Sequence, residues 1–271
     1  MISFPNCKIN IGLNILSKRE DGYHNLQTIF YPIAIHDAVE IIESKNEIPV
    51  SYSHSGIEIF SKPENNLCIK AYHLLKKDFP FLPNIKMHLH KNIPMGAGLG
   101  GGSADAAFVL LLLNHKFELG LSQPQLMDYA LLLGSDCPFF ILNKPCFATG
   151  RGEIMEPIEL NLSNHKIAIV NPGIHVNTGL AFKNISVGEN TVDLKNLIQQ
   201  PIDTWKNSII NDFEKPVFTQ HPSIAALKQE LYSKGALYAS MSGSGSTVFG
   251  IFEKDKLSNF NFPNHYFFRW I

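Results

Sequence analysis

The sequence has almost no excess of charge and no long hydrophobic run, and each shortage excludes a class of protein. Its 271 residues include 23 lysine or arginine and 24 aspartate or glutamate side chains, which gives a formal net charge of −1. Proteins that bind nucleic acid normally show a basic footprint, so we expect no nucleic-acid partner. The longest apolar run, Ala106 to Leu113, is far too short to span a bilayer, so we expect no membrane partner either.

Cysteine is also scarce. Cys7, Cys68, Cys137 and Cys146 are widely spaced and form no CxxC pair. This spacing is typical of buried thiols in a reducing compartment rather than of a disulfide framework or a zinc site, so we expect no protein-bound metal centre. Polar residues interrupt the first fifteen positions, which therefore do not resemble a signal peptide. We expect a soluble, cytoplasmic protein.

The stretch from Ile93 to Asp105 is rich in glycine, and we expect the rest of the chain to be organised around it. Five glycines occupy the seven positions from Gly96 to Gly102, and a run with strong helix propensity begins at Ala106. Glycine allows positive φ and brings backbone N–H groups close to a bulky ligand. Such a loop at the positive end of a helix dipole binds anions, so the pattern predicts a polyphosphate site, with Ser103 at the helix cap.

Other interpretations of this stretch are weaker. A flexible linker does not usually open an apolar helix. Gly96, Gly98 and Gly101 match G-x-G-x-x-G, but the dinucleotide fingerprint needs an apolar strand that runs directly into its first glycine. The residues from Lys91 to Pro94 intervene here. Gly102 stands where a Walker A motif requires lysine.

The segment from Cys7 to Ile15 alternates between apolar and polar side chains, which is the period of a half-buried strand. Lys8 and Asn10 therefore share one face, two residues apart. They are either ordinary residues of a solvated strand face or a lysine and an amide that belong to a site. The pattern alone leaves both interpretations open.

An aromatic residue and a histidine follow a predicted tight turn. Asp21-Gly22 is a turn signal, so Tyr23 and His24 stand at the exit of a loop. They could stack on a flat heterocycle and hydrogen-bond its edge, or they could close the edge of the core.

Asp136 lies in an unusual position for a carboxylate. It falls between a helix that we expect to end at Gly134 and an apparent strand over 139–142. It is either a carboxylate in a cleft or the cap of the turn before Pro138.

Hydrophobic periodicity predicts the remaining elements. We expect strands over 28–33, 38–43, 57–60, 85–90, 166–170 and 247–252, and helices over 65–75, 122–133, 178–184 and 223–234. Asn65 or Asn66 is expected to cap the first of these helices, and Ser122 with Gln125 has capping-box spacing at the second. His88 and His90 share a strand face but lack a third metal ligand. The segment 188–203 is loosely patterned and expected to be mobile, and a domain boundary is expected within 153–163.

Three motifs together resemble the GHMP kinase superfamily. They are the lysine-bearing first strand, the P-x-G-x-G-L-G-x-S-type loop at Pro94 to Ser103, and a second glycine loop at Ser242 to Ser246. Further segments resemble one family within it, which phosphorylates the 2-hydroxyl of a cytidine-diphosphate-linked methylerythritol in the non-mevalonate isoprenoid pathway. These segments are Lys8 to Asn10, Arg19 to Leu26, Gly96 to Asp105, Gly134 to Phe140 and Met241 to Gly250, so the resemblance covers nearly the whole chain.

The resemblance implies an α+β fold of two domains with the active site in the cleft between them. Residues 1–156 would form a ribosomal-protein-like ATP-binding domain that carries the catalytic residues. Residues 157–271 would form a C-terminal α/β-sandwich domain.

The resemblance also implies roles for individual residues. Lys8 and Asp136 would be the catalytic pair, with Asp136 as base and Lys8 as its electrostatic partner. The ATP phosphates would be held by Pro94, Met95, Gly96, Ala97, Gly98, Leu99, Gly100, Gly101, Gly102, Ser103 and Ala104, where Ala104 replaces a serine common in the family. The adenine would lie near Asn66, Leu67 and Lys91. The cytidyl substrate would be bound by Asn10, Tyr23, His24, Thr178 and Phe182.

ATP and Mg²⁺ are the implied cofactors, and a small cytidine diphosphate alcohol is the implied substrate of a monomer or homodimer. Two alternatives remain. A GHMP kinase acting on mevalonate or homoserine would have no use for the pair Tyr23 and His24, since those substrates carry no base to stack. A non-catalytic binding relative would not need Lys8 and Asp136.

Overall fold

The computed structural model describes residues 1–59, 65–183, 185, 192–256 and 258–271. These residues form two compact units. The first comprises Met1–Cys7, Ala34–Met95 and Gly100–Asn143, and the second comprises Lys8–Ile33, Gly96–Leu99 and Lys144–Ile271. The chain therefore passes between the units several times, and the glycine-rich loop contributes residues to both. The linear division at residue 156 stays a prediction.

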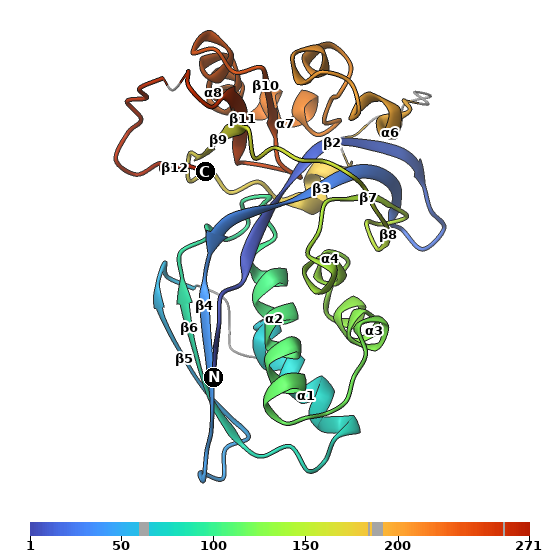
Figure 1. Ribbon diagram of the computed structural model, residues 1–271, viewed down its shortest axis with the longest axis vertical. Coiled ribbons are helices and arrows are strands. Elements are labelled where there is room, and N and C mark those ends of the chain that lie inside the picture. The colour runs from blue at the N-terminus through green and yellow to red at the C-terminus, as the bar shows by residue number, and fades with distance from the viewer. Residues whose placement is uncertain (60–64, 184, 186–191, 257) are drawn as a thin grey trace. The chain divides into compact units, whose positions relative to one another are not determined.

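The first unit contains a four-stranded sheet in the order β1-β4-β6-β5 (Figure 1). The strands are β1 (Ile2–Ser3), β4 (Ala38–Glu43), β5 (Val50–Gly56) and β6 (Ile85–Lys91). β5 pairs with β6 in parallel, and the other neighbours are antiparallel. Ile85, Met87 and Leu89 alternate with more exposed residues, as the sequence pattern predicted.

Helices α1 (Leu67–Asp78), α2 (Gly101–Lys116), α3 (Gln123–Leu133) and α4 (Cys137–Leu142) complete the first unit. α1 packs on α2, and both contact the sheet (Figure 1). The predicted caps are present. Asn66 Oδ1 accepts a hydrogen bond from Cys68 N–H at 2.9 Å, and Gln125 Oε1 accepts one from Ser122 N–H at 2.9 Å.

The second unit contains two four-stranded sheets, in the orders β2-β3-β7-β8 and β10-β11-β9-β12. The strands are β2 (Asn6–Lys18), β3 (His24–His36), β7 (Cys146–Thr149), β8 (Ile154–Pro157), β9 (His165–Asn171), β10 (Tyr238–Met241), β11 (Val248–Glu253) and β12 (Phe267–Trp270). The first residues of β2 and the last of β3 belong to the first unit.

The helices of the second unit are α5 (Thr178–Lys183), α6 (Leu194–Leu197), the 3₁₀ helix η2 (Ile202–Asn207), α7 (Glu214–Gln220) and α8 (Pro222–Ser233). α8 packs on β10 and β11. Its buried residues Ile224, Leu227 and Leu231 recur at helical spacing and join a core that also contains Val170 and Phe252.

Three predicted boundaries are wrong. Residues 139–142 belong to α4 rather than to a strand, because a short apolar run fits a buried helix as well as a strand. Ser103 lies inside α2, whose N-cap is Gly100. Residues 57–59 are not a strand, and Phe60 lies outside the described residues; the edge strand is β5, which pairs with one neighbour and has little apolar pattern.

β2 is buried on both faces rather than half-buried, since its polar residues are as inaccessible as its apolar ones. β3 is also longer than the predicted strand over 28–33. In the described part of the loosely patterned segment 188–203, α6 and the start of η2 are regular, and its residues 188–191 lie outside the described chain. The helix predicted over 178–184 is present as α5, with Asn184 outside the described residues.

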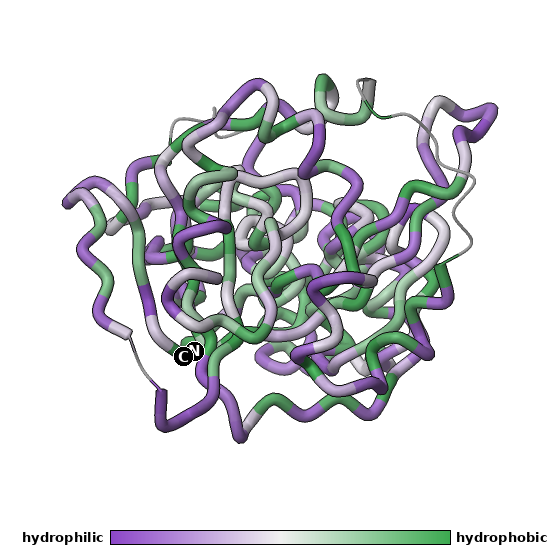
Figure 2. The backbone as a smooth tube through the Cα atoms, turned by 90° about the horizontal axis from the view of Figure 1, so that it is seen from above, coloured by the Kyte–Doolittle hydropathy of each residue, from purple (hydrophilic) through white to green (hydrophobic). Residues whose placement is uncertain are grey.

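Hydrophobic and hydrophilic segments alternate along the whole described chain (Figure 2). Among the described helices, none has the length and apolar character needed to cross a membrane. All four cysteines are buried, as predicted.

Candidate active site

Lys8 and Asn10 lie on β2 and are buried, at 3% and 2% exposure, so they are not part of a solvated strand face. Lys8 Nζ donates to Asn10 Oδ1 at 2.5 Å and lies 4.8 Å from the centre of the Phe30 ring. Asn10 Nδ2 donates to Thr28 Oγ1 at 3.0 Å, and that hydroxyl donates to the Gly12 carbonyl at 2.5 Å. This chain of hydrogen bonds between β2 and β3 fixes the position of the ammonium group.

The middle of the first glycine loop is tied to β2 and to the start of β11. Lys8 N–H donates to the Leu99 carbonyl at 3.0 Å, and Thr247 N–H donates to the Ala97 carbonyl at 3.2 Å. Ala97 and Leu99 are buried, while Met95 and Gly96, which precede them, are exposed. Ala97 and Leu99 therefore anchor the loop, whereas Gly96 and Gly102 are exposed.

The two glycine loops are in direct contact within the second unit. Ser242 Oγ donates to the Gly98 carbonyl at 2.7 Å and accepts from Asn10 N–H at 3.1 Å. A Cβ on Gly98 would lie 2.0 Å from the Ser242 carbonyl oxygen, and Gly98 has φ of 76°. Only glycine fits this approach, which explains its presence physically.

The first loop leads into α2 through Gly100, which has φ of 70° and serves as the N-cap. In any α-helix the N–H groups of the first turn, here from Gly101 to Ser103, have no acceptor within the helix. They lie at the positive end of the dipole of a 16-residue helix. Gly102 is exposed at this end, and the arrangement suits phosphate oxygens.

Asp136 is half-buried and immediately precedes α4. Asp136 occupies the N-cap position of α4, but its side chain makes no capping hydrogen bond to that helix. The next residue, Cys137, is fully buried beside Ser103 of α2. Burial raises the pKa of the Cys137 thiol to about 12, and the hydrogen bond from the Ser103 side chain partly opposes this shift.

The predicted adenine residues lie in the first unit, but they differ in accessibility. Asn66 caps α1, and Leu67 is the half-buried first residue of that helix. Lys91 ends β6, and its ammonium is enclosed between the carboxylates of Asp37 and Asp105. At 1% side-chain exposure, the Lys91 ammonium is committed to these two carboxylates.

The predicted cytosine residues gather in the second unit. The His24 and Phe182 rings stack with their centres 5.0 Å apart and an interplanar angle of 18°. Burial and the nearby Lys18 lower the pKa of His24, so its ring is neutral at pH 7 and offers one donor and one acceptor. Tyr23 is 53% exposed, and the Arg151 guanidinium lies 4.7 Å from its ring centre.

Thr178 begins α5, the helix that carries Phe182. Its Oγ1 lies 2.9 Å from Ser244 Oγ in the second glycine loop. The predicted substrate residues and Lys8 therefore all belong to the second unit, whereas Asp136 and the adenine residues belong to the first.

Two family models match the chain. One is described as the GHMP kinases N terminal domain and covers residues 66–144, and the other as GHMP kinases C terminal and covers residues 193–260. A Bacteroides fragilis 4-diphosphocytidyl-2-C-methyl-D-erythritol kinase is 51% identical over 99% of this chain and 98% of its own length. The chain belongs to this family of GHMP kinases.

Solved structures agree with the fold of this GHMP kinase. A crystal structure of a 4-(cytidine 5'-diphospho)-2C-methyl-D-erythritol kinase matches 93% of the chain and 90% of its own, with a TM-score of 0.76 and 31% identity. The Methanococcus jannaschii mevalonate kinase matches with a TM-score of 0.71 at 12% identity over 94% and 92%, which shows the fold alone. The predicted superfamily and the α+β fold are confirmed.

Some residues of this GHMP kinase site were missed in the sequence. Thr28 continues the hydrogen-bond chain from Lys8, and Ser242 joins the two loops, yet neither was singled out. Asn211 also holds the second loop, since its Nδ2 donates to the carbonyls of Met241 and Gly243 at 2.7 and 2.8 Å. Ser242 stands in a recognised motif and could have been found, but Thr28 and Asn211 carry no local signal.

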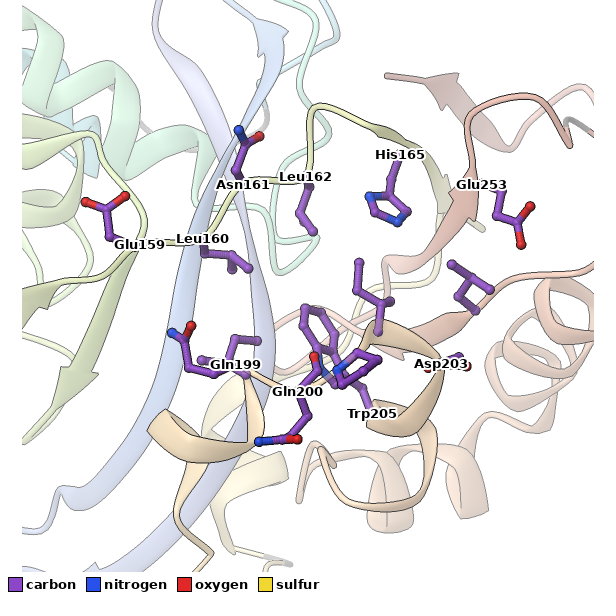
Figure 3. Close-up of a pocket in the computed structure, with 14 residues that line it drawn as sticks. Glu159, Leu160, Asn161, Leu162, His165, Gln199, Gln200, Asp203, Trp205 and Glu253 are labelled. Atoms are coloured by element: carbon purple, nitrogen blue, oxygen red, sulfur yellow. The ribbon is translucent and has the colours of Figure 1, made fainter.

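A separate pocket of about 660 Å³ lies in the second unit of the GHMP kinase (Figure 3). It contains none of the predicted site residues. Figure 3 shows the carboxylates of Glu159, Asp203 and Glu253 among its lining side chains, together with His165 and Trp205. Three carboxylates repel phosphate, so this pocket does not suit a nucleotide.

Proposed function

We propose that this GHMP kinase transfers the γ-phosphoryl group of ATP to the 2-hydroxyl of 4-diphosphocytidyl-2-C-methyl-D-erythritol, a step of the non-mevalonate route to isoprenoid precursors. The single observation that carries the proposal is the 51% identity, over 99% of the chain, to a relative named for that substrate. Two dedicated structural features support it: an anion site at the start of α2 and a surface of aromatic rings at Tyr23, His24 and Phe182.

Asp136 acts in this proposal as the base. Its carboxylate accepts the proton of the 2-hydroxyl as that oxygen attacks the γ-phosphorus, and the bond from phosphorus to the ADP oxygen breaks. Lys8 is its electrostatic partner. A fixed ammonium stabilises the negative charge that develops on the alkoxide and the transferred group, and the hydrogen bond to Asn10 holds it in place before the reaction begins.

The loop from Pro94 to Ala104 binds the ATP phosphates through its backbone N–H groups in this proposal, and Asn66 and Leu67 lie beside the adenine. The cytosine stacks on the exposed ring of Tyr23, and the neutral ring of His24 hydrogen-bonds the edge of the base. Phe182 and Thr178 complete the cytidyl site. The loss of these contacts explains why mevalonate and homoserine would be poor substrates.

In this proposal Mg²⁺ would accompany ATP and would supply charge neutralisation to the phosphates. No group of three or more His, Cys, Asp or Glu side chains in the described part of the chain is arranged to hold a metal ion. We infer that the cation would be held mainly by phosphate oxygens and water, as is common for Mg²⁺.

The test is to follow ADP release from Mg·ATP with each of three alcohols: 4-diphosphocytidyl-2-C-methyl-D-erythritol, mevalonate and homoserine. Turnover with the cytidyl alcohol alone is the expected result. Turnover with a control alcohol alone would keep the phosphate loop and reject the cytosine site. Absence of turnover while ATP still binds would instead favour a non-catalytic binding protein.

A further inference from the structure

A cluster of three buried charges lies in the first unit, and no step of the proposed reaction uses it. Lys91 Nζ donates to Asp105 Oδ2 at 2.7 Å and also donates to Asp37 Oδ2. The side chains of Asp37, Lys91 and Asp105 are 0%, 1% and 3% exposed. These residues are separated by 54 and 14 positions along the sequence, so the cluster joins three distant parts of the chain.

The cluster forms hydrogen bonds with the segment that enters the glycine loop. Asp37 Oδ1 accepts from Asn92 N–H at 2.6 Å and from Ile93 N–H at 2.8 Å, directly before the loop begins. Asp37 is itself anchored, because its own N–H donates to the Pro5 carbonyl at 2.9 Å. A single carboxylate thus fixes two consecutive peptide groups at the loop entrance.

The same cluster also contacts the segment that leaves the loop. Asp105 is the fifth residue of α2, and its Oδ2 receives the Lys91 ammonium. A Cβ on Gly101 would lie 3.1 Å from Lys91 Nζ and 2.9 Å from Ile93 Cγ2, so the first turn of α2 packs directly against the cluster and the loop entrance. Entrance and exit are therefore tied to one another through Lys91.

Burying three charges contributes little net stability, because desolvation offsets most of their attraction. Their geometric effect is larger. The loop between these two anchored segments contains five glycines. Ordering a glycine-rich chain on a ligand costs more conformational entropy than ordering other residues. Because both ends of the loop are already held in place, less conformational entropy is lost when the phosphates bind.

We propose that Asp37, Lys91 and Asp105 are positioning residues that hold the entrance and exit of the glycine loop in the geometry that binds the ATP phosphates. This inference rests on the proposed function for its kinetic consequence. It gives Lys91 a role through the loop rather than through contact of its ammonium with the adenine. The aspartates Asp37 and Asp105 join the site although neither touches a substrate.

The first test compares Asp105→Ala with Asp105→Asn, which keeps an oxygen for Lys91, and with Val109→Ala, a buried α2 substitution one turn away. We expect Asp105→Ala to raise the KM for ATP about tenfold and leave the KM for the acceptor alcohol within twofold of wild type. Asp105→Asn should restore most of the ATP affinity. A loss of active protein alone would lower the apparent kcat without this split, as expected for Val109→Ala, and that result for Asp105→Ala would overturn the proposal.

The second test does not depend on turnover. Amide hydrogen exchange of residues 95–103 in the ligand-free protein should become at least tenfold faster in Asp105→Ala and stay near wild type in Val109→Ala. Unchanged exchange in Asp105→Ala would overturn the positioning role whatever alcohol the enzyme phosphorylates. Absence of turnover in the wild type would overturn the proposed function, while faster exchange in the variant would still support the tie between the two ends of the loop.

Discussion

Lys8 and Lys91 both end up buried on strands, and they differ in the side chains that hold them. Lys91 Nζ donates to two carboxylates, Asp37 and Asp105, which neutralise its charge within the fold. Lys8 Nζ donates to the Asn10 amide, which orients the ammonium without adding a charge of its own. The comparison teaches that burial alone does not indicate what a lysine does. In our proposal, Lys91 ties segments of the fold together through its two carboxylates, and the Asn10 amide orients the Lys8 ammonium for the reaction.

The largest effect is expected at the carboxylate proposed to react, which is half-buried, in contrast to the buried Asp37 and Asp105. Asp136→Ala should fold normally and lower kcat by about 10²–10⁴-fold, the usual contribution of a general base. ADP release under saturating substrates measures this. Asp128→Ala, at an exposed position of α3, is the matched control and should keep wild-type kcat. Near-normal turnover of Asp136→Ala would remove Asp136 as the base.

Lys91→Met should lower the free energy of unfolding by about 3–5 kcal/mol, because it leaves two carboxylates buried without their common cation. Urea unfolding monitored by fluorescence measures the change. Adding Asp37→Asn and Asp105→Asn to the same variant should recover part of the loss. A stability within 1 kcal/mol of wild type for Lys91→Met alone would contradict the structural role of this lysine.

Lys8→Met should show the opposite signature. We expect kcat to fall about 10²–10³-fold, as for the loss of one preorganised donor at a developing charge. The free energy of unfolding should change little, since methionine keeps the apolar stem of the lysine side chain. The same two assays applied to both lysine variants make a direct comparison. A large loss of stability with unchanged kcat in Lys8→Met would instead indicate that Lys8, like Lys91, has a structural role.

The smallest effect concerns pH. Burial raises the pKa of Asp105 to about 7, with Asp37 adding to the rise and Lys91 opposing it; Tyr52 and Cys68 also lie near this group. The folded state therefore binds a proton that the unfolded state has released, and this stabilisation is complete below pH 4 and lost as pH rises through 7. The free energy of unfolding should fall by roughly 1–3 kcal/mol between pH 5 and 8. Asp105→Asn should flatten this slope, and an equal slope in that variant would assign it to other groups.

Local patterns predicted much of the fold. The alternation around Met87, the cap at Asn66 and the periodicity of α8 depend on residues close in sequence, and each is present in the structure. The apolar run at 139–142 could not be assigned, because four apolar residues suit a buried helix or a strand equally. Nor could alternation show that β2 is covered on its polar face, since that depends on other strands.

The candidate site was predictable to the extent that it follows motifs. The glycine loop, Lys8 and Asp136 stand in recognisable segments, and their roles remain predictions that the variants above address. The tie among Asp37, Lys91 and Asp105 was not predictable, because isolated charges at such separations carry no local signal. Thr28 was missed for a similar reason: its link to Asn10 is a tertiary contact between strands.

The burial of every cysteine has a practical consequence for experiments on the loop. Desolvation raises the pKa of the Cys68, Cys137 and Cys146 thiols, so few thiolates exist at neutral pH, and Cys7 is as inaccessible as the others. The native protein should thus react very slowly with maleimide dyes. Met95, 45% exposed at the start of the glycine loop, becomes a site where Met95→Cys would accept a single fluorophore. Nucleotide binding could then be followed by the fluorescence of this dye in the otherwise wild-type enzyme.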